Sequence, residues 1–294
     1  MKKIACVIYF FGKKYEKIGS CAINSFKKFH PDVDLFHINE HNGDEYAATK
    51  SLQLVGHGAY KYLLAAEIMI KHKYDKIIVL GADTITCSRL DEFINGEEDI
   101  LATLDYPYLL QDPIGFALTP DSETHVNADV VCFNNVEAIL DIVNLASNFK
   151  DYGEQGALNY VLWCEDYDYS FKIVDGPYRD SKVVYNVRSK GNICLPHEYQ
   201  DHSATTGVPP KFQRYEKPWG KYLNKFYVEN NKLLTSSGKH VKVWHYCDAF
   251  GNMPEEMFIK LMNNYICNWF NEETKTFFKQ ECDCGDFFEQ EFSL

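Results

Sequence analysis

A single carboxylate follows one of the most apolar segments of the sequence. In the stretch IIVLGADTIT, the apolar run 77–80 stops at Gly81, and Asp83 comes two residues later. Because ligands of open α/β sheets bind beyond the carboxyl ends of the strands, an aspartate at this point can contact a bound ligand. Aspartate is also common in ordinary turns, so Asp83 taken alone leaves a purely structural role open.

Cysteine chemistry is not expected to contribute. The ten cysteines are scattered, and most lie within apolar runs, as Cys6 and Cys132 do. This pattern is typical of buried free thiols rather than of a disulfide framework, which is a feature of short secreted chains. Cys282 and Cys284 form a lone CxC pair without a second pair of ligands, so we do not expect a zinc site there.

The order of the expected elements indicates an α/β fold. A strand at 4–11, a helix at 17–29 and a strand at 34–38 form a βαβ opening, which implies a parallel sheet with a right-handed crossover. The elements expected next are a helix at 59–72, strands at 76–80, 100–104 and 129–133, helices at 136–148 and 156–164, and a strand at 170–174. The central sheet should therefore be mainly parallel and flanked by helices.

The last third of the chain changes character. Residues 176–222 are rich in Pro, Gly, Tyr and charge without a clear period, and we interpret them as long loops over a site. A β-hairpin is expected over 226–246, because Gly238 in its turn permits the positive φ that such turns require. The spacing of apolar residues over 254–270 predicts a C-terminal helix.

The composition excludes some classes of partner. The chain is 46% hydrophobic and 24% charged, as in ordinary globular proteins. A net charge of −12 argues against nucleic acid as a partner, because that binding requires Lys and Arg to neutralise phosphates. No apolar run approaches the ~20 residues that span a bilayer, and the N-terminal apolar stretch lacks a signal-peptide cleavage site. We therefore expect a cytoplasmic protein without a transmembrane segment.

Five segments, in order, resemble the GT-A fold glycosyltransferases. The resemblance is to glycosyltransferase family eight, the glycogenin-like and bacterial galactosyltransferase-like enzymes. The segments are IACVIYFFGKKYEKIGSCAINSFKKFHP, AYKYLLAAEIMIKHKYDKIIVLGADT, VNADVVCFNN, EQGALNYVL and VKVWHYCDAFGN. The resemblance implies a GT-A catalytic domain over 1–252, with acceptor-side loops at 176–222. Residues 253–294 would then form a helical extension packed on the same domain.

The resemblance also implies a divalent cation, Mn²⁺ or Mg²⁺, held by Asp83 and His245. Such a cation neutralises the charge on the diphosphate of a nucleotide sugar, and oxygen and imidazole ligands suit it. The first aspartate of the family's D-x-D motif is Gly81 here. A weaker site with more water ligands, replacement by another carboxylate such as Asp105 or Asp248, and loss of the metal are the alternatives. A lone histidine on an apolar strand is often a packed residue, which is the alternative for His245.

The resemblance places a UDP-linked donor near the end of the first strand. The donor-binding residues that it implies are Tyr9, Phe10, Phe11, Tyr15, Lys61, Ala82 and Asn127, with Lys13 and Lys14 as further basic candidates. An aromatic face can stack on uracil, but strand alternation lets only part of the aromatic set face the ligand. Phe10 or Phe11 could therefore belong to the core, and Lys61 could equally be a solvated helix lysine.

The implied catalytic residues are Gln155, Glu154 and Asp129. The family's Asn-Ala-Gly and Asp-Gln pairs, which line the donor sugar, read Asn127-Ala128-Asp129 and Glu154-Gln155 here. Asp129 replaces a glycine and adds a carboxylate that could bind sugar hydroxyls. Glu154 could equally be an acidic residue that the helix dipole favours in a first turn. Gln155 is the residue that we expect on the face where the acceptor attacks.

Together, these expectations predict a hexosyltransferase that moves a sugar from a UDP-hexose to a hydroxyl of a glycan or other acceptor. The resemblance implies retention, either through a protein nucleophile, Glu154 or Asp129, or through same-face attack in which the departing phosphate takes the acceptor's proton. Two alternatives are a non-catalytic nucleotide- or sugar-binding relative and a sugar-phosphate nucleotidyltransferase. The loop FFGKKYEK has a single Gly and no Arg, which argues against the nucleotidyltransferase.

Overall fold

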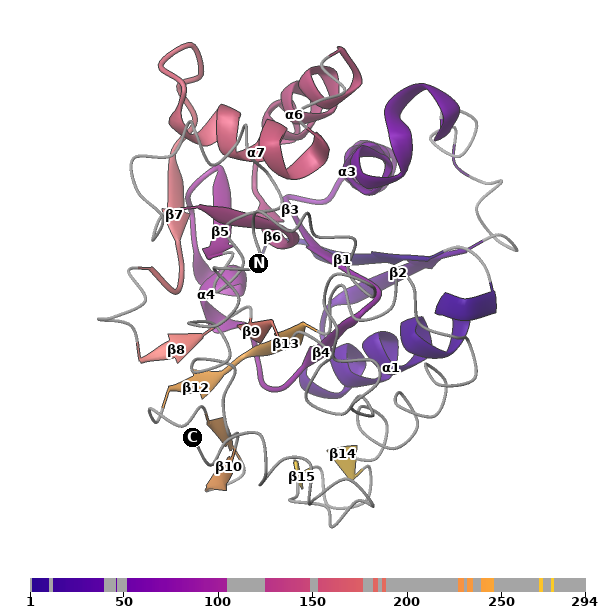
Figure 1. The fold of residues 1–294 in the computed structure, drawn as a ribbon, viewed down its shortest axis with the longest axis vertical. Coiled ribbons are helices and arrows are strands. Elements are labelled where there is room, and N and C mark those ends of the chain that lie inside the picture. Colours follow the sequence, from indigo (N-terminus) through magenta and orange to yellow (C-terminus); the bar gives the residue numbers. More distant parts are fainter. Residues whose placement is uncertain are drawn as a thin grey trace, which may run out of the picture.

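A six-stranded sheet forms the centre of the molecule, with strand order β2-β1-β3-β6-β5-β7 (Figure 1). The computed structural model describes residues 2–10, 13–39, 46, 52–104, 125–148, 153–176, 182–184, 187–188, 227–229, 232–234, 239–245, 270–271 and 276–277. The strands of the central sheet are β1 (Ile4–Tyr9), β2 (Asp34–Ile38), β3 (Lys76–Leu80), β5 (Ile100–Leu104), β6 (Val126–Phe133) and β7 (Phe171–Ile173).

The sheet is mainly parallel, as expected, with one exception. β1 is parallel to both β2 and β3, and β5 is parallel to β7. β6 runs antiparallel to its neighbours β3 and β5. The beginning of β6 therefore lies at the same edge of the sheet as the ends of β1 and β3.

Helices cover both faces of the sheet. α3 (Leu52–His72), α6 (Val136–Asn148) and α7 (Gly153–Trp163) pack on one face, and α1 (Lys13–Phe29) and α4 (Asp91–Asn95) lie on the other (Figure 1). The α/β architecture with flanking helices is thereby confirmed. α3 begins seven residues before the expected helix at 59–72. Gly56 and Gly58 weaken the helical signal there, because glycine has a low helix propensity.

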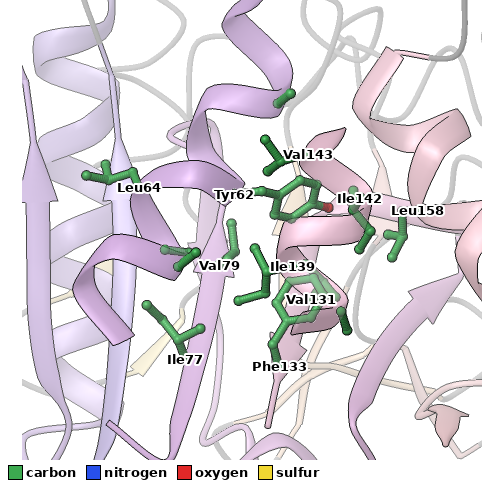
Figure 2. Packing of buried hydrophobic residues seen from close by; sticks show 14 of the residues in the cluster. Tyr62, Leu64, Ile77, Val79, Val131, Phe133, Ile139, Ile142, Val143 and Leu158 are labelled. Atoms are coloured by element: carbon green, nitrogen blue, oxygen red, sulfur yellow. The ribbon is translucent and has the colours of Figure 1, made fainter. Parts of the chain in front are cut away.

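The strands alternate their side chains between two cores. In β3, Ile77 and Val79 pack under α3 and α6, whereas the next residue along the strand in each case, Ile78 and Leu80, packs toward α1 and α4. Figure 2 shows the first of these cores, where the rings of Tyr62 and Phe133 meet edge to face with centroids 5.5 Å apart. Each such buried side chain contributes about 1.5–3 kcal/mol, so this core fixes the helices on the sheet.

Short strands follow in the C-terminal third. They are β4 (Thr84–Thr86), β8 (Val183–Val184), β9 (Val187–Arg188), β10 (Tyr227–Glu229), β11 (Lys232–Leu234), β12 (His240–Val241), β13 (Val243–His245), β14 (Phe270–Asn271) and β15 (Thr276–Phe277). β8 and β9 lie within the segment that we interpreted as loops. Strand β12 belongs to the sheet β10-β11-β12-β8, whereas the next strand, β13, belongs to a different sheet. There β13 pairs antiparallel with β4 and parallel with β9.

The expected hairpin over 226–246 is divided. β10 and β11 pair with each other, and β11 pairs with β12 through Leu234 and His240. The sequence between them, Asn230-Asn231, favours a two-residue hairpin loop, since asparagine tolerates the backbone angles of such a loop. Most of the expected C-terminal helix, 254–269, and the expected domain boundary after residue 252 lie outside the described residues.

Two expectations from composition can be compared with the described residues. Cys6, Cys87 and Cys132 are buried and do not form disulfides, as the cysteine pattern predicts. Cys282 and Cys284 lie outside the described residues. Within the part of the chain that the structure describes, no helix combines the length and apolar character required to cross a bilayer.

Candidate active site

The ends of β1 and β3 and the beginning of β6 form one edge of the central sheet. Leu80, the last residue of β3, pairs with Val130, and one step further the Gly81 N–H donates to the Asp129 carbonyl at 2.8 Å. On its other side, β6 loses regular register with β5. Leu101 pairs with Cys132 and Thr103 with Asn127, so β6 has surplus residues around Asp129. A bulge of this kind changes the direction of side chains, and here it lies where the carboxylates meet.

Lys61 joins three elements at this edge. Its side chain projects from α3 and forms ion pairs with Asp129 of β6 and, at 3.6 Å, with Oε1 of Glu154 in α7. The residue is only 2% exposed, so the alternative of a solvated helix lysine is wrong. Burial lowers the pKa of the Lys61 ammonium, but Asp129 and Glu154 raise it more, and the net pKa lies well above the usual value. Lys61 is therefore a permanent positive charge between two carboxylates.

Neighbouring residues on α3 fix the position of this cluster. The buried Tyr62 hydroxyl donates to the Ala128 carbonyl at 2.7 Å, which holds α3 against β6. Gly58 lies one turn before Lys61, and a Cβ at residue 58 would come within 1.9 Å of Glu154 Oε2. The Glu154 carboxylate thus rests against the backbone of α3. Sequence reasoning missed Gly58, although its i, i+3 spacing to Lys61 places both on one helix face.

An amide network attaches α7 to the beginning of β6. Gln155 Oε1 accepts hydrogen bonds from Asn127 Nδ2 and from the Ala128 N–H, each at 3.2 Å. Asn127 Oδ1 in turn accepts the Asp129 N–H at 2.8 Å. One turn along α7, Asn159 accepts the Val126 N–H at 3.0 Å and donates to the Val126 carbonyl at 2.9 Å. Asn159 was not among the sequence candidates; the only signal for it is its i, i+4 spacing from Gln155.

Tyr9 and Phe10 point to opposite faces of the sheet. Tyr9 packs edge to face on Tyr60, with ring centroids 5.5 Å apart. Burial raises the pKa of the Tyr9 phenol; Lys61 opposes this rise, whereas Asp129 and Glu154 add to it, so Tyr9 lies within reach of the charged cluster.

Phe10 belongs to the core on the other face. It is 6% exposed, and a Cβ at Gly19 of α1 would come within 2.4 Å of its ring. The core alternative therefore describes Phe10. Phe11 lies outside the described residues, as do the side chains of Lys13, Lys14 and Tyr15.

Asp83 lies in a tight turn between β3 and β4. The Thr84 N–H and hydroxyl both donate to the Gly81 carbonyl, at 3.2 and 2.7 Å, which closes the turn around Ala82 and Asp83. Both turn residues are partly exposed. A Cβ at residue 81 would lie 3.0 Å from Asp83 Oδ1 and 3.3 Å from the carboxyl carbon of Asp129. Gly81 thus leaves room for two carboxylates that flank it.

The backbone of His245 lies beside this turn. In the antiparallel pair of β13 with β4, His245 is opposite Thr84, the residue after Asp83. Cα atoms of directly opposed residues in such a pair are about 4.5–5.5 Å apart. The His245 side chain, Asp105 and Asp248 lie outside the described part of the chain.

The described side chains include oxygen ligands that suit a divalent cation. Carboxylate oxygens such as those of Asp83 and Asp129 are the ligands that Mg²⁺ and Mn²⁺ prefer. Among the described side chains, His, Cys, Asp and Glu do not gather in groups of three or more that could hold a metal ion. The two carboxylates that flank Gly81 fit a hard cation as part of a ligand set, to which His245 would add from β13.

Comparison with solved structures identifies the fold. The bifunctional glycosyltransferase WbbM, in its apo form, matches 88% of this chain and 51% of its own, with a TM-score of 0.50 and 13% identity. The galactosyltransferase LgtC in complex with donor and acceptor sugar analogs matches 88% of this chain and 95% of its own, with a TM-score of 0.45 and 15% identity. The glycosyltransferase GlyE of Streptococcus pneumoniae TIGR4 matches 96% of this chain and 66% of its own, with a TM-score of 0.47 and 14% identity. No protein-family model and no curated protein matches. The order and direction of the strands, together with the match to WbbM, show that this chain has the α/β fold of the GT-A glycosyltransferases.

Proposed function

We propose that this protein is a glycosyltransferase that transfers a hexose from a UDP-linked donor to a hydroxyl of a glycan or other acceptor, with retention of configuration. The observation that carries the proposal is the charged cluster of Lys61, Asp83, Asp129 and Glu154 at the carboxyl edge of β1 and β3. Ligands of open α/β sheets bind at this edge. The fold supports the same class of reaction.

The charge of the cluster favours a donor that arrives with a divalent cation. Among the described side chains at this edge, three carboxylates face one ammonium, so these groups would repel a diphosphate that arrives alone. Asp83 and His245 would hold Mn²⁺ or Mg²⁺ in this proposal. When bound, such a cation neutralises the negative charge that develops on the departing diphosphate.

Gln155 of the amide network would contact the donor sugar, and the fully buried Asn127 would hold Gln155 in place. Gln155 and Asn127 hold each other in fixed orientations, and uncharged amides can bind sugar hydroxyls without competing for the cation. A site that is already ordered loses little entropy when the substrate binds. Tyr9, beside the same cluster at the end of β1, is positioned to contact the nucleotide.

Same-face attack is the route that the ion pairs favour. The Glu154 and Asp129 carboxylates are both paired with the buried Lys61, which lowers their reactivity as nucleophiles. In same-face attack the acceptor oxygen bonds to the anomeric carbon as the bond to the diphosphate oxygen breaks. The acceptor's proton passes to that departing oxygen, so no protein nucleophile is required.

A panel of nucleotide sugars tests the proposal. Melting temperature is measured with UDP-, GDP- and ADP-sugars, with and without Mn²⁺, and release of the nucleoside diphosphate is then followed with a mixture of glycan acceptors. A UDP-hexose should raise the melting temperature in the presence of Mn²⁺, because it binds only the folded state. The anomer of the product, read by NMR, tests retention.

Variants separate the alternatives. Asp83→Asn should abolish UDP release, whereas Asp168→Asn, which removes an exposed carboxylate after α7, should leave it unchanged. Binding of a UDP-sugar without turnover in the presence of any acceptor would indicate a non-catalytic relative. Formation of a nucleotide sugar from a sugar phosphate and UTP would indicate a nucleotidyltransferase. A panel in which no nucleotide sugar binds would refute the proposal.

A further inference from the structure

Gly81 and Asp129 occupy directly opposed positions on two neighbouring strands. The β3–β6 pairing ends with Leu80 opposite Val130, and the Gly81 N–H continues the ladder with its 2.8 Å bond to the Asp129 carbonyl. In an antiparallel pair, side chains of opposed residues stand on the same face of the sheet. A side chain at residue 81 and the side chain of Asp129 would therefore compete for one volume.

The distances around Gly81 show this competition. A Cβ built at residue 81 would be 3.1 Å from the Asp129 Cβ and 3.0 Å from an Asp83 carboxylate oxygen. Both distances are shorter than an ordinary van der Waals contact of about 3.5–4.0 Å. A side chain at residue 81 would therefore have to displace Asp83 or Asp129 by a few tenths of an ångström, and in this chain the carboxylate beside Asp83 is that of Asp129.

The Asp129 carboxylate is held in place and paired with a cation. Asn127 Oδ1 accepts the backbone N–H of Asp129 at 2.8 Å, and the Lys61 ammonium pairs with Asp129 Oδ1. A carboxylate has two oxygens and about four lone-pair sites, so it can bind a lysine and a metal ion at the same time. The site therefore offers a fixed anionic oxygen donor on the Asp83 side of β6.

The geometry points to Asp129 as a cation ligand that acts together with Asp83. Its carboxylate comes from β6, on the strand position directly opposite Gly81, which has no side chain. This inference rests on the proposed function, because it assigns a ligand to the cation that the function uses. It also gives Gly81 a role: the glycine makes room for the carboxylate of its strand partner.

An exchange of the two residues tests the inference. Mn²⁺ affinity is measured in the presence of UDP by the EPR signal of free Mn²⁺, for the wild type, Asp129→Asn, Gly81→Asp and the double variant Gly81→Asp/Asp129→Gly. Asp129→Asn should weaken Mn²⁺ binding by about tenfold or more, because affinity follows the number of charged ligands. The double variant should recover binding to within about threefold of wild type, since the carboxylate returns from the opposite strand. Gly81→Asp alone should lower the melting temperature, because two side chains then share one volume.

Glu154→Gln is the matched comparison. It removes the same charge and the other carboxylate partner of Lys61, but residue 154 is not opposite Gly81. Asp129→Asn should therefore weaken Mn²⁺ binding several times more than Glu154→Gln does. Equal effects would mean that Asp129 acts only through its charge, and the inference would be overturned.

The outcomes distinguish this inference from the proposed function. Wild-type affinity in Asp129→Asn, together with UDP release by the wild type, would overturn the inference and leave the function in place. A wild type that binds UDP-hexose but no Mn²⁺ would refute both the ligand assignment and the use of a metal. If Asp129→Asn does not fold, the double variant decides: a folded double variant that does not bind Mn²⁺ contradicts the inference.

Discussion

Replacement of Lys61 by Met should destabilise the protein through the two carboxylates left behind. Lys61 is buried and pairs with Asp129 and Glu154, whose side chains are each 29% exposed. Met has a length similar to that of Lys and can fill the same buried space, so the variant removes charge with little loss of packing. The expected loss is therefore electrostatic in origin.

The magnitude follows from the distances. At the 3.6 Å separation from Glu154, the Coulomb attraction is about 5 kcal/mol for an effective dielectric constant of about 20. The desolvation of the buried ammonium offsets part of this attraction, and removal of one partner from a buried pair typically costs about 3–5 kcal/mol. We expect a loss in that range at pH 8.

Urea unfolding at pH 8 measures this effect. Lys71→Met is the control, because Lys71 is an exposed lysine in the last turn of the same helix, and its removal should cost less than about 1 kcal/mol. If Lys61→Met and Lys71→Met unfolded at the same urea concentration at pH 8, the buried ion-pair cluster would be refuted.

Three further predictions concern other parts of the fold. Gly58→Ala should displace the Glu154 carboxylate from Lys61, so the free energy of unfolding should fall despite a gain of up to about 1 kcal/mol in helix propensity, and UDP release should fall as well; full activity would contradict the packing at this contact. Lys73, at the end of α3, has a positive φ of 54°, so Lys73→Gly should stabilise the fold by about 1 kcal/mol in thermal unfolding, and a loss of stability would argue against that backbone conformation. Burial lowers the pKa of His30 to about 4, below the value of about 6.5 in the unfolded chain. The unfolded state therefore binds more protons between these values, and stability should fall by up to about 3 kcal/mol as the pH drops from about 6.5 to about 4. His30→Gln should show a shallower slope in that window, and equal slopes in urea titrations would count against a neutral buried His30.

Local pattern predicted much of the fold. β2, β3, β5 and α6 have the expected bounds, because each is an apolar or periodic run with clear polar or turn residues at its ends. Elements with mixed signals were less predictable. Glycines conceal the first turns of α3, and the segment around β10 to β13 divides into short strands whose partners lie far away in sequence.

The candidate site was harder to predict than the elements that build it. The individual residues Lys61, Asp129 and Glu154 were candidates, but their contact depends on the direction of β6. A strand parallel to β3 would have placed Asp129 at the opposite edge, far from Asp83. Nothing in the local sequence of a single buried strand specifies its direction, because side-chain alternation is the same in both. For the same reason, the meeting of Gly81 and Asp129 became visible only in the register of the sheet.

The irregular pairing of β6 with β5 has a consequence for how this site can change over time. Strand residues that are paired on both sides can change their backbone conformation little, because their N–H and C=O groups are bonded to both neighbouring strands. Around Asp129 the surplus residues of β6 escape that constraint toward β5, while the ladder toward β3 stays intact. A new donor preference should therefore require changes at residues 127–130 together with their partners on β3, α3 and α7, and laboratory evolution should begin with libraries that vary Asp129 jointly with Gly81 and Lys61.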